Sequence, residues 1–179
     1  MSELLDRPTI LSAFEKLSSE LARRGTRADV FVVGGAAMAL AYQAGRRTAD
    51  IDAVFDRPAT VYEAARAVAR RMGLPGDWLN DAVRGYLLGG DPDATVVYES
   101  DSLHVSVGSA PYVLAMKLLA ARAEQDVDDI RALYRLCGFS RVEDGLGLLR
   151  RYLPDEPVPE ATRELLEAMY GQPAGDGPG

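Results

Sequence analysis

The sequence is poor in cysteine, in long apolar runs and in positive charge. Its single cysteine, Cys137, excludes an internal disulfide and argues against a thiolate metal site, and its apolar neighbours predict a core thiol. No run reaches the roughly 20 uncharged apolar residues of a membrane helix, and no basic segment leads into an apolar one at the N-terminus, so we expect a cytoplasmic protein. The formal net charge of −7 disfavours a broad nucleic-acid surface, because phosphates are bound by lysine and arginine. The net charge does not exclude a local basic patch, and arginines outnumber lysines eighteen to two.

What is present indicates an α/β protein. With 179 residues and 47% hydrophobic content, the chain can bury one core, or one core plus a helical extension. Apolar periodicity predicts strands over 30–33, 49–55, 95–98 and 103–107, and helices over about 7–24, 36–43, 59–72, 109–122, 126–136, 141–152 and 158–170. Residues 73–92 are predicted to form a long loop or a short irregular helix. This order favours a small mixed sheet flanked by helices, with an α/β core at 1–108, a helical C-terminal part at 109–170 and a disordered tail at 171–179.

One short segment carries the chemistry. An apolar strand ends in Gly34 and Gly35, and the next predicted strand contains Asp50 and Asp52. Strand residues two apart share a face, so these two carboxylates should lie roughly 6.5–7 Å apart at Cα, where they repel unless a cation lies between them. Oxygen ligands of this kind suit Mg²⁺, and a diglycine followed by a helix can hold phosphates. Each feature alone has an ordinary interpretation, a tight turn or a solvated strand; the combination favours a metal and phosphate site.

These residues resemble the nucleotidyltransferase superfamily, whose pattern is a hydrophobic residue and Gly-Gly or Gly-Ser, a short helix, and Asp-hydrophobic-Asp. Within it, residues 30–136 look most like the AbiEii/MenT-type toxins and their uncharacterised relatives. The resemblance implies a nucleotidyltransferase-like fold, Mg²⁺ or Mn²⁺, a nucleoside triphosphate donor, tRNA 3′ ends as acceptor, and a cognate antitoxin protein. By this similarity Asp50 and Asp52 bind metal, Lys117 contacts the triphosphate and Asp126 completes the catalytic set. The nucleotide-binding set would be Gly34, Gly35, Arg47, Thr48 and Lys117.

Three of these residues can also be interpreted from their local context. Lys117 is the only charge in an apolar helical stretch, so it needs an anionic partner, phosphates or the Asp50/Asp52 pair, or a route to solvent. Asp126 either serves the site or caps its own helix. Thr48 either supplies a hydroxyl ligand or is an ordinary β-branched strand residue.

One feature of the superfamily is missing. Many active members carry a third carboxylate on a later strand, and the strand 103–107 has none. His104 could serve as a general base or be structural, and Glu99 and Asp101 lie in the adjoining turn. Three functions therefore stay open: a toxin that modifies RNA, a transferase for a small hydroxylated molecule of the aminoglycoside type, and a non-catalytic domain that binds nucleotide or a protein partner.

Overall fold

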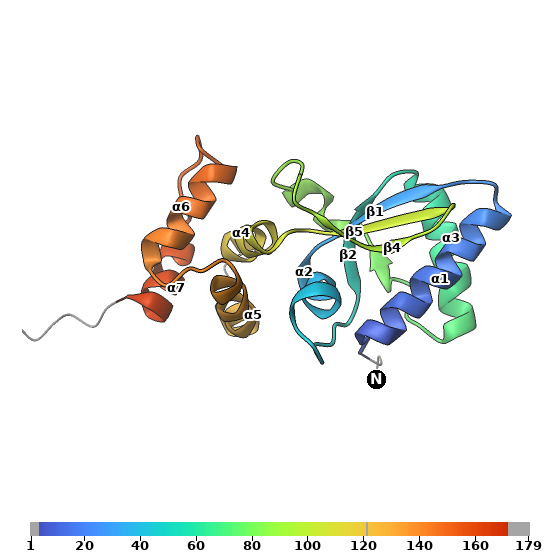
Figure 1. The fold of residues 1–179 in the computed structure, drawn as a ribbon, viewed down its shortest axis with the longest axis horizontal. Coiled ribbons are helices and arrows are strands. Elements are labelled where there is room, and N and C mark those ends of the chain that lie inside the picture. Colours follow the sequence, from blue (N-terminus) through green and yellow to red (C-terminus); the bar gives the residue numbers. More distant parts are fainter. Residues whose placement is uncertain (1–3, 121, 172–179) are drawn as a thin grey trace, which may run out of the picture. The chain divides into compact units, whose positions relative to one another are not determined.

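The computed structural model describes residues 4–120 and 122–171, and the chain forms two compact units, residues 1–109 and 110–179 (Figure 1). The predicted α/β class, a small mixed sheet with flanking helices and a helical C-terminal part, is confirmed. The prediction of a disordered tail concerns residues of which 172–179 lie outside the described part of the chain. Within that part, none of the helices combines the length and apolar character that a membrane crossing requires.

The first unit is built on a five-stranded sheet with strand order β3-β2-β1-β5-β4. The pairs β1/β5 and β2/β3 are parallel, and β1/β2 and β4/β5 are antiparallel. The strands are β1 (Ala28–Val32), β2 (Ile51–Phe55), β3 (Leu79–Asn80), β4 (Thr95–Glu99) and β5 (Leu103–Val107). The helices are α1 (Arg7–Arg23), α2 (Gly34–Ala37), a π-helix (Met38–Tyr42), α3 (Pro58–Met72) and a 3₁₀ helix (Ala82–Tyr86).

Strand alternation gives the sheet two different faces. In β1, β2 and β5 every second residue is a buried apolar side chain, and these form the core under α1 and α3. The intervening residues project from the opposite face, which we call the outer face. Its side chains from these three strands are Asp29, Phe31, Asp52, Val54, His104 and Ser106.

The segment 73–92 contains the short irregular helix that the sequence predicts, the 3₁₀ helix Ala82–Tyr86, and also a strand that it does not predict. Leu79 and Asn80 form β3, a strand of two residues, which is too short to leave a periodic pattern. Trp78 anchors it: the side chain is fully buried, and its indole Nε1 donates to the carbonyl of Ala65 in α3 at 3.0 Å. β3 is thereby fixed at the edge of the sheet beside β2.

The second unit consists of α4 (Ala110–Ala120), α5 (Ala123–Leu136), α6 (Val142–Tyr152) and α7 (Glu160–Tyr170). Thr162 of α7 is fully buried and donates its hydroxyl to the carbonyl of Leu118 at 2.7 Å, which ties α7 to α4. Cys137, predicted to be a core thiol, is only half-buried at the end of α5; burial still raises the pKa of its thiol.

A buried glutamate joins α1 to α3. Glu20 is 4% exposed, and its carboxylate pairs with Arg23 of α1, with the C-cap residue Arg24 and with Arg71 of α3. The Arg24 Nη1 to Oε2 distance is 2.6 Å. The hydrogen bond from Arg24 is the main cause that lowers the pKa of Glu20, against the opposing effect of burial. The charged form is therefore the one that stabilises the fold.

We expect acid to remove this stabilisation. A carboxyl whose pKa is lower in the folded state stabilises above its unfolded value, 4.5, and loses that contribution as the pH falls through the folded value. Glu20→Gln should therefore lower the Tm at pH 7 by a few degrees and flatten the dependence of Tm on pH below about 4.5. The matched control is Glu15→Gln, an exposed position in the same helix, which should keep the wild-type curve. Parallel curves for wild type and Glu20→Gln would contradict the assignment.

Candidate functional site

The glycine pair lies where β1 leaves the sheet. Val33 still donates its N–H to the carbonyl of Asp52 at 3.0 Å, and Gly34 then adopts a φ of +64°, a conformation that side chains disfavour. α2 begins at Gly34, two residues earlier than the predicted helix, and continues directly into the π-helix that ends at Tyr42. The first N–H groups of a helix have no carbonyl partner within it and carry partial positive charge, so this turn can hold an anion.

Both glycines lie against polar side chains. A Cβ atom on Gly34 would lie 3.1 Å from Oδ2 of Asp52, and a Cβ on Gly35 would lie 2.7 Å from Oγ1 of Thr48. Real Cβ atoms essentially never come as close as the second distance. The absence of side chains at 34 and 35 therefore allows the Asp52 carboxylate and the Thr48 hydroxyl to lie directly beside the turn.

Asp50 is placed differently from the prediction but on the same side. β2 begins at Ile51 rather than at 49, so Asp50 lies in a bend just before the strand. Its Oδ2 accepts a hydrogen bond of 3.0 Å from Nδ2 of Asn80, and Asn80 is the register partner of Asp52 across β2 and β3. Directly paired residues project from the same face of a sheet, so Asp52 and Asn80 lie together on the outer face, and the hydrogen bond places the Asp50 carboxylate next to Asn80.

Asn80 belongs to the candidate site, although no pattern in the sequence pointed to it. Its Oδ1 accepts from the N–H of Ala82 at 3.2 Å, which orients the side-chain amide so that its NH₂ group faces Asp50. The NH₂ group then holds one oxygen of the Asp50 carboxylate in place. The available signal was an amide directly after the apolar pair Trp78-Leu79. Only the pairing of β3 with β2, which no local pattern encodes, assigns it to the aspartates.

Thr48 and Arg47 precede the aspartates. Thr48 forms a two-way backbone bridge with Leu5, and its Oγ1 donates to the carbonyl of Asp50 at 3.0 Å, so the hydroxyl holds the bend while lying beside Gly35. Arg47 is exposed, and its positive charge contributes to a lowered pKa of Asp6 that is caused mainly by hydrogen bonds from Thr9. A phosphate contact by Arg47 stays a prediction.

Lys117 has two carboxylate partners within the second unit. The residue is 7% exposed, and its Nζ lies 2.5 Å from Oδ1 of Asp126 and 2.9 Å from Oδ2 of Asp129. Asp126 lies inside the first turn of α5, whose N-cap is Arg122. Since a buried ammonium requires paired anions, these contacts explain a lysine in an apolar helix. Its contact with a triphosphate stays a prediction.

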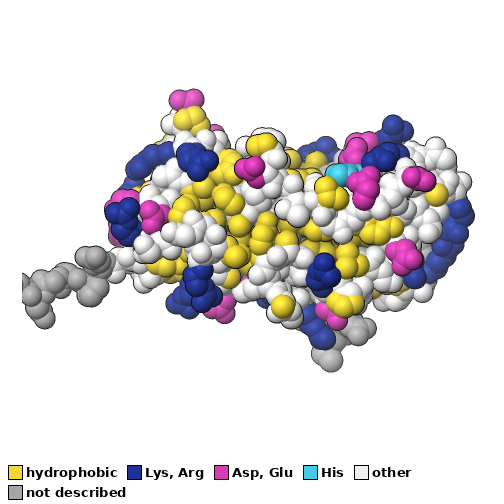
Figure 2. All heavy atoms as spheres, in the orientation of Figure 1, with side chains coloured by type: hydrophobic (Ala, Val, Ile, Leu, Met, Phe, Trp, Pro, Cys, Tyr) yellow, Lys and Arg dark blue, Asp and Glu magenta, His cyan; other side chains and the backbone are white. Residues whose placement is uncertain are grey.

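The three groups considered as substitutes for a third carboxylate lie elsewhere on the sheet. His104 bonds Glu99 through Nδ1, and this contact, followed by that of Arg27, lowers the pKa of Glu99. Figure 2 shows the histidine among acidic and basic side chains. His104 is the register partner of Asp29, near the start of β1. The backbone carbonyl of Asp52 accepts from Val33, just after β1 ends. Asp29 and Val33 are four residues apart, which corresponds to about 13 Å along an extended strand. Asp101 is exposed in the turn after β4.

The carboxylates of Asp50 and Asp52 are suited to a divalent cation that is also coordinated by the phosphates of a substrate. Among the described residues, no three His, Cys, Asp or Glu side chains are grouped closely enough to hold a metal ion by themselves. Mg²⁺ is usually bound by one or two carboxylates, with water and substrate phosphates completing its shell, and Mn²⁺ accepts the same oxygen ligands. Asp50 and Asp52 are the two carboxylates that could supply such ligands, and Asp52 lies against the turn at Gly34.

Comparison with known families agrees with this geometry. A family model described as "Nucleotidyltransferase of unknown function (DUF6036)" matches residues 9–88, a range that contains the glycine turn, both aspartates and Asn80. The match supports the nucleotidyltransferase superfamily and a general role in nucleotidyl transfer, without specifying the AbiEii/MenT type. No match was found among curated proteins or among solved structures.

The contact between Gly35 and Thr48 gives a direct test of the turn. Gly35→Ala should weaken binding of a nucleoside triphosphate roughly tenfold, because the new methyl group must displace either the Thr48 hydroxyl or the helix start. Titration with a fluorescent nucleotide analogue in the presence of Mg²⁺ measures the affinity.

A second variant isolates the cause. Thr48→Ala removes the oxygen at 2.7 Å, so Gly35→Ala combined with Thr48→Ala should recover part of the lost affinity relative to Gly35→Ala alone. Gly147→Ala is the matched control, because a Cβ there meets no atom within 4 Å. Wild-type affinity in Gly35→Ala would show that the turn does not hold the nucleotide.

Proposed function

We propose that this protein is a metal-dependent nucleotidyltransferase that moves a nucleotide from a nucleoside triphosphate to a hydroxyl group at the 3′ end of an RNA, foremost a tRNA. The observation that carries the proposal is the Asp52 carboxylate packed against Gly34, with Asp50 held on the same face by Asn80. A cation site and a phosphate-binding turn then share one edge of the sheet, which is the arrangement that nucleotidyl transfer requires.

The reaction is an in-line displacement at the α-phosphorus. The acceptor oxygen forms a new bond to phosphorus, the bond from phosphorus to the bridging oxygen breaks, and pyrophosphate leaves with that electron pair while the hydroxyl proton passes to water. The N–H groups at the start of α2 hold the donor phosphates, and Asp50 and Asp52 would hold the divalent cation. When bound, this cation supplies Lewis-acid stabilisation of the α-phosphoryl oxygens.

The proposed acceptor and biological role rest on the resemblance to AbiEii/MenT-type toxins. On that basis the protein acts in the cytoplasm as the toxin of a toxin–antitoxin pair and binds a cognate antitoxin protein. The abundance of arginine over lysine is compatible with local RNA contacts, because guanidinium groups pair bidentately with phosphates.

Two other functions each have one observation in their favour. The net charge of −7 favours a small cationic acceptor of the aminoglycoside type over a polyanion. The positions of His104, Glu99 and Asp101, away from the aspartate pair, favour a non-catalytic domain that binds nucleotide or a protein partner.

One experiment separates these functions. The protein is incubated with each α-labelled nucleoside triphosphate and Mg²⁺ or Mn²⁺, together with total RNA, an aminoglycoside mixture or no acceptor. Label that appears on RNA of tRNA size supports the proposal, and label on an aminoglycoside replaces it with the small-molecule function. Nucleotide binding without transfer to any acceptor would leave the non-catalytic function. Growth arrest on expression, relieved by a neighbouring gene, would support the toxin role.

A further inference from the structure

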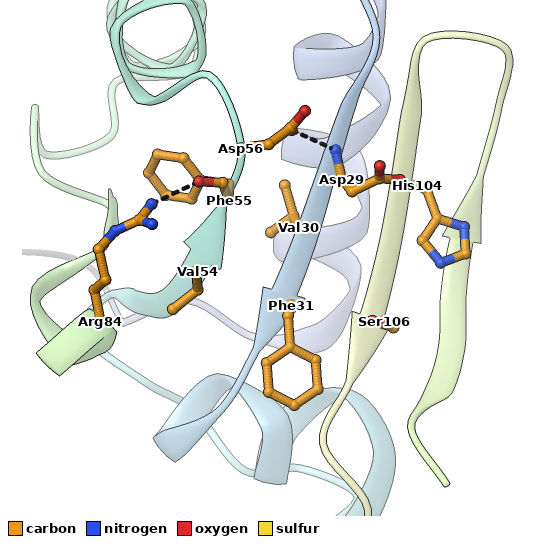
Figure 3. A pocket seen from close by; sticks show the side chains of 9 residues that line it. All are labelled: Asp29, Val30, Phe31, Val54, Phe55, Asp56, Arg84, His104 and Ser106. Atoms are coloured by element: carbon orange, nitrogen blue, oxygen red, sulfur yellow. Dashed lines mark hydrogen bonds between the residues drawn. The ribbon is translucent and has the colours of Figure 1, made fainter. Parts of the chain in front are cut away.

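A groove of about 350 Å³ crosses the outer face of the sheet over β1, β2 and β5 (Figure 3). Phe31 and Val54 are register partners and are both half-buried, so they form an apolar floor. The polar lining comes from different strands and from the 3₁₀ helix.

The groove begins next to the aspartate pair. Asp52 and Val54 are two residues apart in β2 and project from the same face, which places their Cα atoms about 6.5–7 Å apart. The glycine turn lies at the end of β1, and the groove extends from Phe31 toward the start of β1 at Asp29. In an in-line displacement the attacking hydroxyl enters opposite the leaving pyrophosphate. A nucleotide held by the turn would therefore be attacked from the side where the groove lies.

The charges that line the groove disfavour an anion. The exposed carboxylate of Asp29 lies toward His104 on one side, and Asp56 accepts from the Asp29 N–H at 2.9 Å. On the opposite side Arg84 donates to the carbonyl of Phe55 at 2.6 Å. Arg84 also pairs with Asp81 through Nε at 3.0 Å, so its charge is balanced, and the carboxylates of Asp29 and Asp56 repel a phosphate.

A neutral, flat group with donors and acceptors on its edge fits both sides. Nucleobases have this chemistry: their faces pack on aromatic and apolar side chains, and their edges carry amino donors beside ring nitrogen or carbonyl acceptors. An ionised carboxylate only accepts hydrogen bonds, so Asp29 favours a base with an exocyclic amino group. Arg84 can donate to the acceptors on the same base.

We propose that this groove holds the terminal nucleobase of the acceptor RNA and prefers a base with an amino group, which is adenine, cytosine or guanine, over uracil. This proposal rests on the proposed function and names the part of the acceptor that is recognised. Asp29 and Phe31 are binding residues here, and the donor nucleotide is held elsewhere, at the glycine turn.

The test uses the full chain and short RNA acceptors that differ only in the 3′ base. Asp29→Asn should raise the KM for acceptors ending in adenine or cytosine about tenfold and reduce their advantage over uracil, because an amide also donates hydrogen bonds. Phe31→Leu keeps an apolar floor without the aromatic ring and should raise the KM for all acceptors. Both variants should keep the wild-type affinity for the triphosphate. Asp93→Asn, an exposed carboxylate in the turn before β4, is the charge-matched control.

Binding of the same labelled RNAs without triphosphate or metal gives a second readout. Weaker binding by Asp29→Asn and Phe31→Leu than by Asp93→Asn supports the groove even where no transfer occurs. Wild-type RNA affinity and KM in both variants would overturn it, as would a small amine in place of RNA as the acceptor. Failure of the proposed function would give a different result, because the wild-type protein itself would then bind no triphosphate or transfer no nucleotide.

Discussion

Replacing Asp52 with asparagine is expected to reduce nucleotidyl transfer about a thousandfold or more, since a bound cation contributes several kcal/mol of transition-state stabilisation and an amide is a poor ligand for it. Asp50→Asn should act in the same direction. The structural reason is the position of Asp52 against Gly34, where its carboxylate faces the proposed phosphate-binding turn. Transfer of an α-labelled nucleotide, measured over a range of Mg²⁺ and Mn²⁺ concentrations, provides the readout.

Stability separates a catalytic role from a structural one. Two neighbouring carboxylates repel each other, so removing one charge without changing the side-chain shape should leave the Tm unchanged or raise it slightly. Asp128→Asn changes the charge equally at a position whose side chain is 92% exposed in the second unit, and should affect neither activity nor Tm. Wild-type transfer by both Asp50→Asn and Asp52→Asn would remove the proposed metal site, and with it the mechanism.

The parts of the candidate site that could be predicted are those that a short stretch of sequence determines. The turn at Gly34 and the direction of the Asp52 side chain in β2 depend on a few consecutive residues, whose effects on backbone conformation and on side-chain direction are local. The same holds for the strand Leu103–Val107, whose alternation predicts its bounds as the structure has them. Such features need no knowledge of what packs beside them.

The parts that could not be predicted depend on partners distant in the chain. Asn80 meets Asp50 only because the buried Trp78 fixes β3 beside β2, thirty residues from that aspartate. The sequence did not show whether Lys117 reaches solvent or an anionic partner. In the structure α5 packs against α4 and brings Asp126 and Asp129 to the Lys117 ammonium. Pairings between elements decide these contacts, and a two-residue strand leaves too little pattern to reveal one.

Gly145→Ala is expected to destabilise the helical second unit. A Cβ at this position of α6 would lie 2.1 Å from Oη of Tyr134, 3.1 Å from its Cζ and 3.0 Å from a methyl group of Leu166. Tyr134 cannot easily move, because it is 1% exposed and stacks on Tyr170 with ring centroids 4.1 Å apart, and burial raises the pKa of its phenol.

Two opposing effects decide whether this substitution raises or lowers the free energy of unfolding. Alanine is better than glycine inside a helix by about 1 kcal/mol, whereas overpacking a rigid core costs typically 1–3 kcal/mol and occasionally more. An overlap at 2.1 Å with a fully buried ring belongs at the upper end, so we expect a net loss of about 2 kcal/mol and a fall in Tm of roughly 4–8 °C by thermal unfolding. Gly147→Ala, two residues along the same helix with open space around its Cβ, should be neutral or stabilising. Combining Gly145→Ala with Tyr134→Phe removes the closest atom and should recover part of the loss, while equal stability of the two alanine variants would contradict the packing of α6 on Tyr134.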